Sequence, residues 1–232
     1  MILRTKLRRW PRRTKTMTNY PSGRLVTVTS PGDVASEDYR VLRANLLALG
    51  DKSPKTLMVA SPGPAEGKST TCANLGVVLA QAKKSTLILD CDLREPMIHK
   101  IFGLQNTWGV VNVLVGEYDL QEICQAPLPG LTVGVAGPVP PDPAELLISE
   151  GFVELLNQVR REFDYVLLDV PSTQLASDAI VVASQADGVL LVIDSKGTQK
   201  RSIRQSMRSL ETVGASVLGM VINNATTSAD GY

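Results

Sequence analysis

The sequence predicts an α/β fold in which a doubly wound, mostly parallel sheet has helices on both faces. Two observations predict it. Short apolar segments alternate with segments of helical periodicity from residue 34 to about residue 224, which is the pattern of strands joined by crossover helices. The apolar residues 57–60 also lead into a loop rich in Pro and Gly, and a helical pattern begins just after Gly67. The sequence has no internal repeat and no sign of a second core, so we expect one domain.

The predicted elements follow in chain order. The first helix covers residues 34–49, where the apolar side chains recur at helical spacing, at Ala35, Tyr39, Leu42 and Leu46. The first strand covers residues 56–60, and the helix after the loop runs to residue 82. Further strands are predicted at residues 85–90, 131–136, 165–169, 188–194 and 217–222. Further helices are predicted at residues 96–102, 110–115, 144–162 with a break near Gly151, 178–184 and 198–213.

Charge and cysteine content narrow the class of protein. Residues 1–24 carry eight Lys or Arg and no acid. Because the whole chain has 24 basic and 23 acidic residues, the remainder carries 16 against 23, a net charge of −7. For the basic segment, a solvated tail, an extension upstream of a start at Met17, and a contact with anionic lipid or nucleic acid all remain open. Cys72, Cys91 and Cys124 are too far apart for a CxxC motif and odd in number, which argues against a disulfide framework or a zinc or iron–sulfur site, so we expect small core residues.

The domain organisation follows from the same patterns. We expect a basic segment at residues 1–33, a folded domain at residues 34–224 and a short tail at residues 225–232. No apolar run approaches the roughly 20 residues that cross a bilayer, and the start lacks the apolar region of a secretory signal. We therefore expect a cytoplasmic protein, and we expect no nucleic-acid partner.

Residues 58–70 carry the first functional motif. A strand, a turn-rich loop and a helix that opens with Gly-Lys-Ser form a phosphate-binding loop (P-loop), because backbone N–H groups and the positive end of the helix point at one anion. Pro62 stands where the strict pattern has Gly. The motif indicates a P-loop NTPase fold. The candidate nucleotide-binding residues in it are Gly63, Glu66, Gly67, Lys68, Ser69 and Thr70.

Three acids follow predicted strands, at Asp90, Asp92 and Asp169. The carboxyl ends of parallel strands meet at one edge of the sheet, so these acids can converge on phosphates held by Lys68. In that arrangement Lys68 offsets phosphate charge, Ser69 supplies a hydroxyl ligand to Mg²⁺, and Asp169 orients the metal. Asp90 is the best candidate to accept a proton from, or orient, an attacking hydroxyl. Asp92 supports Asp90 or the metal, and Asp90 also counts among the metal-site candidates. The sequence thus predicts binding of a nucleoside triphosphate with Mg²⁺.

The first predicted helix also carries charged residues away from its apolar stripe. Glu37, Arg40 and Arg43 are spaced three apart. They could pair within the helix, where such pairs contribute a few tenths of a kcal/mol, or contact a neighbouring subunit. Their spacing leaves both alternatives open.

These motifs together resemble the bacterial tyrosine kinases. The segment Glu66-Gly67-Lys68-Ser69-Thr70, preceded by Ser61 and Pro64, is similar to their Walker A motif. Residues 87–94, Leu-Ile-Leu-Asp-Cys-Asp-Leu-Arg, are similar to their Walker A′ motif, and residues 165–169 are similar to their Walker B motif. The pattern Glu-x-x-Arg-x-x-Arg at residues 37–43 matches the helix by which these kinases associate into rings. The resemblance covers about residues 35–224.

The resemblance implies an ATP- and Mg²⁺-dependent autokinase that phosphorylates tyrosines of neighbouring subunits in capsule or exopolysaccharide synthesis. A chain without a membrane span resembles the separate cytoplasmic subunit, which a transmembrane chain-length regulator activates at the inner face of the plasma membrane. A tyrosine phosphatase is a further implied partner. The resemblance also implies subunit contacts through Glu37, Arg40 and Arg43, and nucleotide contacts through Arg94 and, at the adenine, Asn223.

Two departures from the family pattern stand out. The family's Walker B motif continues Asp-Thr-Pro-Pro, whereas this chain has Asp169-Val-Pro-Ser172. The family ends in a cluster of tyrosines, whereas Tyr232 is the only tyrosine in this tail. Either Tyr232 is the phosphoacceptor, or another protein is the substrate, or kinase output is reduced.

Three other classes compete with a kinase. A partition-type ATPase would carry a signature Lys at the position of Gly63. An iron–sulfur carrier would need a CxxC motif, which is absent. A structural subunit that binds nucleotide and phosphorylates nothing is the third alternative.

Overall fold

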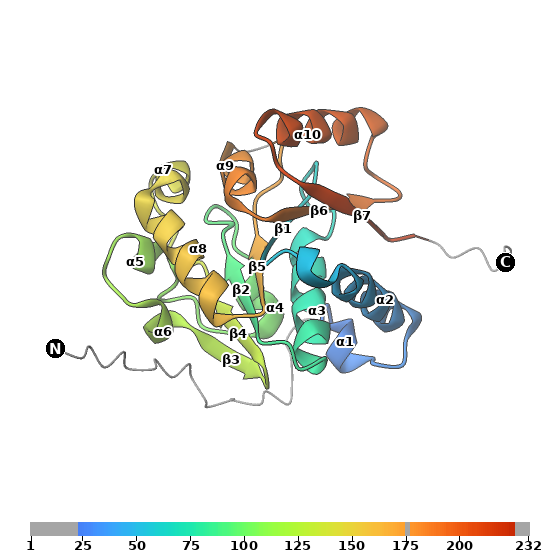
Figure 1. Cartoon of the computed structure of the whole chain (residues 1–232), viewed down its shortest axis with the longest axis horizontal. Coiled ribbons are helices and arrows are strands. Elements are labelled where there is room, and N and C mark those ends of the chain that lie inside the picture. The colour runs from blue at the N-terminus through green and yellow to red at the C-terminus, as the bar shows by residue number, and fades with distance from the viewer. Residues whose placement is uncertain (1–22, 175–176, 226–232) are drawn as a thin grey trace, which may run out of the picture.

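The computed structural model describes residues 23–174 and 177–225 (Figure 1). Within these residues one seven-stranded sheet forms the centre, in the order β3-β4-β2-β5-β1-β6-β7. Neighbouring strands are parallel except for β3 and β4, which are antiparallel. The strands are β1 (Thr56–Ala60), β2 (Thr86–Asp90), β3 (Gln125–Leu128), β4 (Leu131–Gly134), β5 (Tyr165–Asp169), β6 (Gly188–Asp194) and β7 (Val217–Asn223). The predicted fold class is confirmed.

Helices cover both faces of the sheet (Figure 1). One face packs against α1 (Val26–Thr29), α2 (Val34–Ala48), α3 (Lys68–Gln81) and α4 (Ile98–Phe102). The other packs against α5 (Val110–Leu114), α6 (Leu120–Ile123), α7 (Pro143–Ile148), α8 (Glu150–Glu162), α9 (Ser177–Gln185) and α10 (Lys200–Thr212). A short 3-10 helix, η1 (Gly50–Lys52), precedes β1. None of the described helices is both long and apolar enough to cross a membrane.

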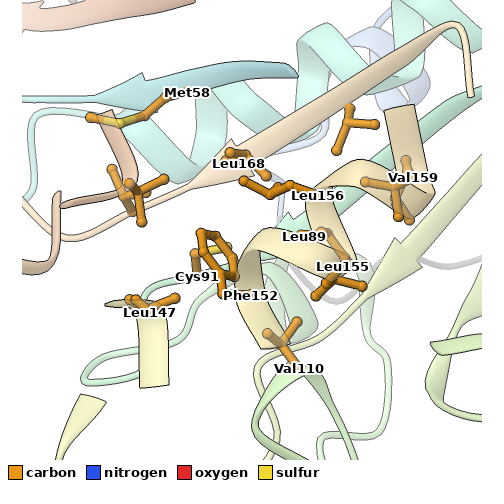
Figure 2. Packing of buried hydrophobic residues seen from close by; sticks show 14 of the residues in the cluster. Met58, Leu89, Cys91, Val110, Leu147, Phe152, Leu155, Leu156, Val159 and Leu168 are labelled. Atoms are coloured by element: carbon orange, nitrogen blue, oxygen red, sulfur yellow. The ribbon is translucent and has the colours of Figure 1, made fainter. Parts of the chain in front are cut away.

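The face covered by α8 shows how the core is built. Phe152, Leu155, Leu156 and Val159 recur at helical spacing, and Figure 2 shows them packed together with Met58, Leu89 and Leu168, which come from three neighbouring strands. The Ser149 hydroxyl accepts a hydrogen bond from the backbone N–H of Phe152 at 3.3 Å and caps this helix. The predicted helix at residues 144–162 is therefore divided at Ser149, close to the break expected near Gly151.

Helix α3 lies almost entirely inside the molecule. Every residue from Thr71 to Ala80 is buried, so this helix lacks the polar face of a surface helix. Gly76 lets it approach the sheet, because a Cβ atom there would lie 2.6 Å from Cδ1 of Ile88. The three cysteines are buried and unpaired, as expected of core residues. The P-loop thus leads from a buried strand into a buried helix, which holds it in place.

The folded region extends N-terminal to the expected boundary at residue 34. Leu25 is fully buried, and the backbone N–H and hydroxyl of Thr27 both donate to Oδ1 of Asn74, at 3.1 and 2.8 Å. Nδ2 of Asn74 in turn donates to the backbone carbonyl of Arg24 at 2.7 Å. A buried amide with all these partners fastens residues 24–27 to α3. The basic residues 1–22 and the tail residues 226–232 lie outside the described residues.

Several details differ from the sequence-based prediction. Ala35 is exposed, and Ser36 is the buried residue at the start of α2, where its hydroxyl donates to the carbonyls of Val26 and Ser30. The elements α1, η1, α6 and β3 were not predicted. Strand β3 contains Pro127 and pairs only with β4, and Pro is tolerated at such an edge because its missing N–H breaks no ladder bond.

Candidate active site

The P-loop lies at the carboxyl end of β1, where the strand order reverses: β5 and β2 lie on one side, and β6 and β7 on the other. Ligands of doubly wound sheets bind at such a switch point. Gly67 has φ of 100°, in the left-handed region, directly before α3 begins at Lys68. A Cβ atom on Gly67 would also lie 2.1 Å from Nδ2 of Asn223. Both the backbone angle and the close approach therefore require glycine.

Glu66 shapes the loop from inside. Its Oε2 accepts a hydrogen bond from the backbone N–H of Gly63 at 3.0 Å, and its Oε1 accepts one from the hydroxyl of Thr198 at 2.6 Å. Nδ2 of Asn223 donates to the Glu66 carbonyl at 3.0 Å. The predicted nucleotide residues Gly63, Glu66 and Asn223 are thus brought together, with the Glu66 carboxylate directed at the loop itself. Thr198 gave no signal in the sequence, because its contact spans 132 residues.

A pocket of about 730 Å³ opens beside the loop, a size suited to a nucleotide. Predicted site residues account for seven of its lining residues: Gly67, Lys68, Ser69, Thr70, Asp92, Arg94 and Asn223. The remaining lining residues, which sequence reasoning did not single out as ligand contacts, are Arg24, Pro64, Ala65, Glu95, Met97, Pro171, Ser172 and Asn224. Most of these residues lie next to a predicted motif in the sequence, and that position could have predicted them as lining residues.

Lys68 is the positively charged residue of the P-loop. Its Nζ lies 2.8 Å from Oδ2 of Asp92 and 3.3 Å from Oγ of Ser69. Burial acts to lower the pKa of Lys68, but the carboxylates of Asp169 and Asp92 outweigh it, and the pKa is raised. The ammonium group therefore stays charged at every physiological pH, ready to offset phosphate charge.

Asp90 and Asp92 hold the turn that follows β2. Asp90 is fully buried, and its two oxygens accept hydrogen bonds from the backbone N–H groups of Ile98 (3.1 Å) and Asp92 (3.2 Å). Burial, followed by the nearby Asp169, raises the pKa of Asp90 well above its usual range. Asp92 lines the pocket, and its Oδ1 accepts from the backbone N–H of Glu95 at 3.0 Å. The two acids lie in one turn. Asp92 lines the pocket, whereas Asp90 is fully buried behind it.

The carboxyl of Asp169 is buried in the site without a hydrogen-bond partner for either oxygen in the described part of the chain. Asp169 pairs in register with Asp90 on the neighbouring strand and is fully buried. Burial raises its pKa to about 6, while the charge of Lys68 and the Ser69 hydroxyl, which lies near the carboxyl but outside hydrogen-bond geometry, act in the opposite direction. Buried polar groups nearly always have partners, so this carboxyl indicates a ligand that brings positive charge.

The donor set suits Mg²⁺. This ion takes hard oxygen ligands, uses one or two carboxylates, and keeps its other positions for water and nucleotide phosphates. The Ser69 hydroxyl and the Asp169 carboxylate are oxygen donors of that kind, and their role as metal ligands stays a prediction. Over the described part of the chain, no group of three or more His, Cys, Asp or Glu side chains could hold a metal ion on its own. A Mg²⁺ ion at this site would depend on the nucleotide.

Arg94 is anchored rather than free. Its Nε and Nη2 donate to Oδ2 and Oδ1 of Asp178, at 2.7 and 3.1 Å, and the Asp178 side chain is fully buried. This two-point pair ties the turn after β2 to the first turn of α9, while Arg94 still lines the pocket. The signal for Asp178 in the sequence was a single acid at the start of an apolar helix.

The charged residues of α2 bind within the chain. Nη1 of Arg40 lies 2.7 Å from Oε2 of Glu37, and Nη2 of Arg40 donates to the carbonyl of Pro31 at 2.5 Å. Nη1 of Arg43 donates to the carbonyl of Val78 in α3 at 3.0 Å. The intrahelical alternative is confirmed for Glu37 and Arg40, and contacts with another subunit remain a prediction. Tyr232, the predicted phosphoacceptor, lies outside the described residues.

Comparison with known proteins identifies the family of this chain. The CobQ/CobB/MinD/ParA nucleotide binding domain family matches residues 57–230. Tyrosine-protein kinase YwqD of Bacillus subtilis is 39% identical over 201 residues, which cover 86% of this chain and 85% of the relative. This chain belongs to the bacterial tyrosine kinase family.

Solved kinase structures agree with this membership. The kinase domain of Escherichia coli tyrosine kinase ETK superposes with a TM-score of 0.84 at 30% identity, covering 93% of this chain and 85% of that one. The chimerical protein CapA2B2 also gives a TM-score of 0.84, at 31% identity, covering 88% of this chain and 91% of that one. MinD and ParA share the domain family, which is why a partition-type ATPase competed with a kinase as an interpretation of the sequence.

Proposed function

We propose that this chain transfers the terminal phosphoryl group of Mg-ATP to tyrosine hydroxyls, on neighbouring copies of itself or on a partner, and thereby regulates capsule or exopolysaccharide synthesis. One observation supports it most: the unpartnered Asp169 carboxyl lies with Lys68 and Ser69 at the P-loop of a bacterial tyrosine kinase. Such a site needs a metal and a phosphate to become satisfied.

The residues divide the work of phosphoryl transfer. Backbone N–H groups of the loop and the start of α3 bind the phosphates, and Lys68 offsets their charge. Ser69 and Asp169 would hold a Mg²⁺ ion, which would supply positive charge against the charge that develops on the transferred group. Phosphoryl transfer depends mainly on such positioning and electrostatic stabilisation.

We assign acceptance of the tyrosine proton to the turn formed by Asp90 and Asp92. Asp92 lines the pocket that an incoming hydroxyl must enter. Asp90 is buried behind it, and its two oxygens accept the backbone hydrogen bonds that fix the turn. Arg94 holds the turn in place through Asp178.

The proposal includes partners. We place the chain at the inner face of the plasma membrane through a transmembrane chain-length regulator that activates it, with a tyrosine phosphatase to reverse the modification. We also propose ring-like self-association through α2, with Tyr232 as the acceptor. Family membership supports both, and the length of α2 and its exposed Glu37 leave a surface on which a second copy can dock.

Phosphotyrosine blotting tests the kinase proposal. The full chain, co-expressed with the chain-length regulator from its own gene neighbourhood, should be phosphorylated. Lys68→Met should abolish the signal, whereas Lys100→Met, which removes an exposed lysine on α4, should retain it. A signal that is lost in Tyr232→Phe identifies the acceptor, and a signal that persists places it elsewhere. No signal from the wild type with the regulator present would contradict the proposal and favour a nucleotide-binding structural subunit.

A further inference from the structure

Ser172 has a buried hydroxyl that makes no hydrogen bond to any described residue. The residue is 3% exposed, and its Oγ has no hydrogen-bond partner in the part of the chain that the structure describes. Ser172 nevertheless lines the nucleotide pocket, together with Lys68 and Ser69. It follows Asp169, the other unpartnered group of the site, by three residues. A hydroxyl that has left water without gaining a partner destabilises the free protein, so its position at the pocket calls for an explanation.

The backbone around Ser172 is held from both sides. The N–H of Thr173 donates to the carbonyl of Ser61 at 2.9 Å, and the N–H of Gln174 donates to the carbonyl of Pro62 at 3.3 Å. On the other side, Oγ1 of Thr173 donates to Oγ of Ser206 in α10 at 2.7 Å. The segment is thus fastened to the first residues of the P-loop and to α10. Thr173 shows that a hydroxyl in this segment can find a protein partner, and Ser172 has none.

The position of Ser172 relative to the strand ends indicates which part of a bound nucleotide would contact its hydroxyl. The pocket extends from Asn223 at the end of β7, across the P-loop, to Ser172 after β5 and Asp92 after β2. Lys68 forms its ion pair with Asp92, which follows β2, and β2 is the neighbour of β5, the strand that precedes Ser172. Because Lys68 offsets the charge of the outer phosphates, we expect the terminal phosphate on the side of the pocket that Asp92 and Ser172 line.

We infer that the Ser172 hydroxyl donates a hydrogen bond to an oxygen of the terminal phosphate of the bound nucleoside triphosphate. The inference rests on the proposed function, because it needs a Mg-nucleotide in this pocket. A hydroxyl is a good donor to an anionic oxygen, and such charge-assisted bonds are stronger than neutral ones. Ser172 is then a further nucleotide-binding residue, whose unmet hydrogen bond in the free protein is made when the triphosphate binds.

Isothermal titration calorimetry on the full chain tests this inference. The probes are Mg²⁺ with a non-hydrolysable ATP analogue and Mg²⁺ with ADP. Ser172→Ala should weaken binding of the triphosphate analogue about tenfold, the effect of losing one hydrogen bond to a charged group. Binding of ADP should stay unchanged. Ser172→Gly, which also removes the hydroxyl without adding bulk, should show the same selective loss.

Thermal unfolding of the nucleotide-free variants separates binding from packing. Ser172→Ala should leave the melting temperature unchanged or raise it, because it deletes an unpartnered hydroxyl. The control Ser36→Ala removes a buried hydroxyl that has two partners far from the pocket, so it should lower the melting temperature and leave both affinities unchanged.

Three results would overturn the inference. The first is that Ser172→Ala binds the triphosphate analogue as tightly as the wild type does. The second is that Ser172→Ala weakens the binding of both nucleotides equally. Either result would show that Ser172 makes no hydrogen bond to the terminal phosphate. A wild-type chain that binds neither nucleotide would overturn the proposed function itself, and that result is distinct from a selective effect of the variant.

Discussion

The phosphate-binding loop and the segment that faces it across the pocket differ in how their polar groups are satisfied. On the loop side, the Ser61 hydroxyl donates to the carbonyl of Gly63 at 2.6 Å, and both carboxylate oxygens of Glu66 accept hydrogen bonds. On the facing side, the carboxyl of Asp169 and the hydroxyl of Ser172 are buried without hydrogen-bond partners among the residues that the structure describes. The loop is therefore held in its conformation by hydrogen bonds within the protein, before any nucleotide binds. The facing segment carries buried polar groups that would gain partners when a Mg-nucleotide binds. Until then these groups lower the stability of the free protein.

The largest effect is expected on the facing side. Asp169→Asn should reduce tyrosine phosphorylation by about 10²–10⁴-fold, because the amide cannot supply the negative charge that holds the metal. Radioactive phosphate transfer with the regulator present measures the rate. Asp164→Asn is the matched control at the other end of β5, where the carboxylate accepts two bonds from Ser85; it should retain activity. Comparable activity in Asp169→Asn and wild type would remove Asp169 from the site.

A smaller effect is expected on the loop side, and there it should appear in the free protein. Glu66→Ala removes two hydrogen bonds to a buried carboxylate, so the free energy of unfolding should fall by about 2–4 kcal/mol. Nucleotide binding should weaken as the loop loosens. Thr198→Val removes one of the Glu66 bonds and also the bond that Oγ1 of Thr198 accepts from the backbone N–H of Asp194 at 2.8 Å, so it should cost about 1–2 kcal/mol. Urea unfolding measures both values. If Glu66→Ala weakened binding without loss of stability, Glu66 would contact the nucleotide directly.

The pH dependence of the free protein should report Asp169. Its pKa in the folded state, about 6, lies above its ordinary value of 3.8, so the folded protein binds more protons than the unfolded chain between these two values. Stability contributed by this group is then fully present below about pH 4 and is lost as the pH rises to about 6. Urea unfolding of nucleotide-free wild type and Asp169→Asn, compared between pH 4 and 7, checks it: the wild type should lose stability relative to the variant as pH rises. A constant difference would contradict the assignment.

The elements that the sequence predicts correctly depend on local patterns, whereas the elements that it misses depend on contacts between residues far apart in the chain. The strands at residues 56–60 and 165–169 were predicted because each is a local apolar run, and both have the predicted bounds. Helix α1 was missed because its four residues depend on Asn74, 47 positions away from Thr27. The site shows the same division. The P-loop and the acids after strands follow local patterns, whereas the inward direction of Glu66 and the pair of Arg94 with Asp178 arise only from folding.

The smallest effect on the folded chain is expected at α2. Arg40→Ala with Arg43→Ala breaks one exposed ion pair and two bonds to backbone carbonyls, those of Pro31 and Val78, so the free energy of unfolding should fall by only about 1 kcal/mol. Ring formation through α2 predicts that the same variant shifts light scattering to a smaller mass. Arg204→Ala with Arg208→Ala removes the same charge from the exposed face of α10 and should leave the mass unchanged. Equal masses for both double variants would exclude α2 as the contact.

Thermal unfolding of wild type and Asp169→Asn at pH 7.5, without nucleotide and with Mg²⁺ and a non-hydrolysable ATP analogue, tests the central claim most directly. The claim is that the Asp169 carboxyl destabilises the free protein and is satisfied by the Mg-nucleotide. The variant should melt at a higher temperature than the wild type without ligand and at a lower temperature with it. A variant that melts below the wild type in both conditions would contradict the claim, because Asp169 would then already be satisfied in the free protein.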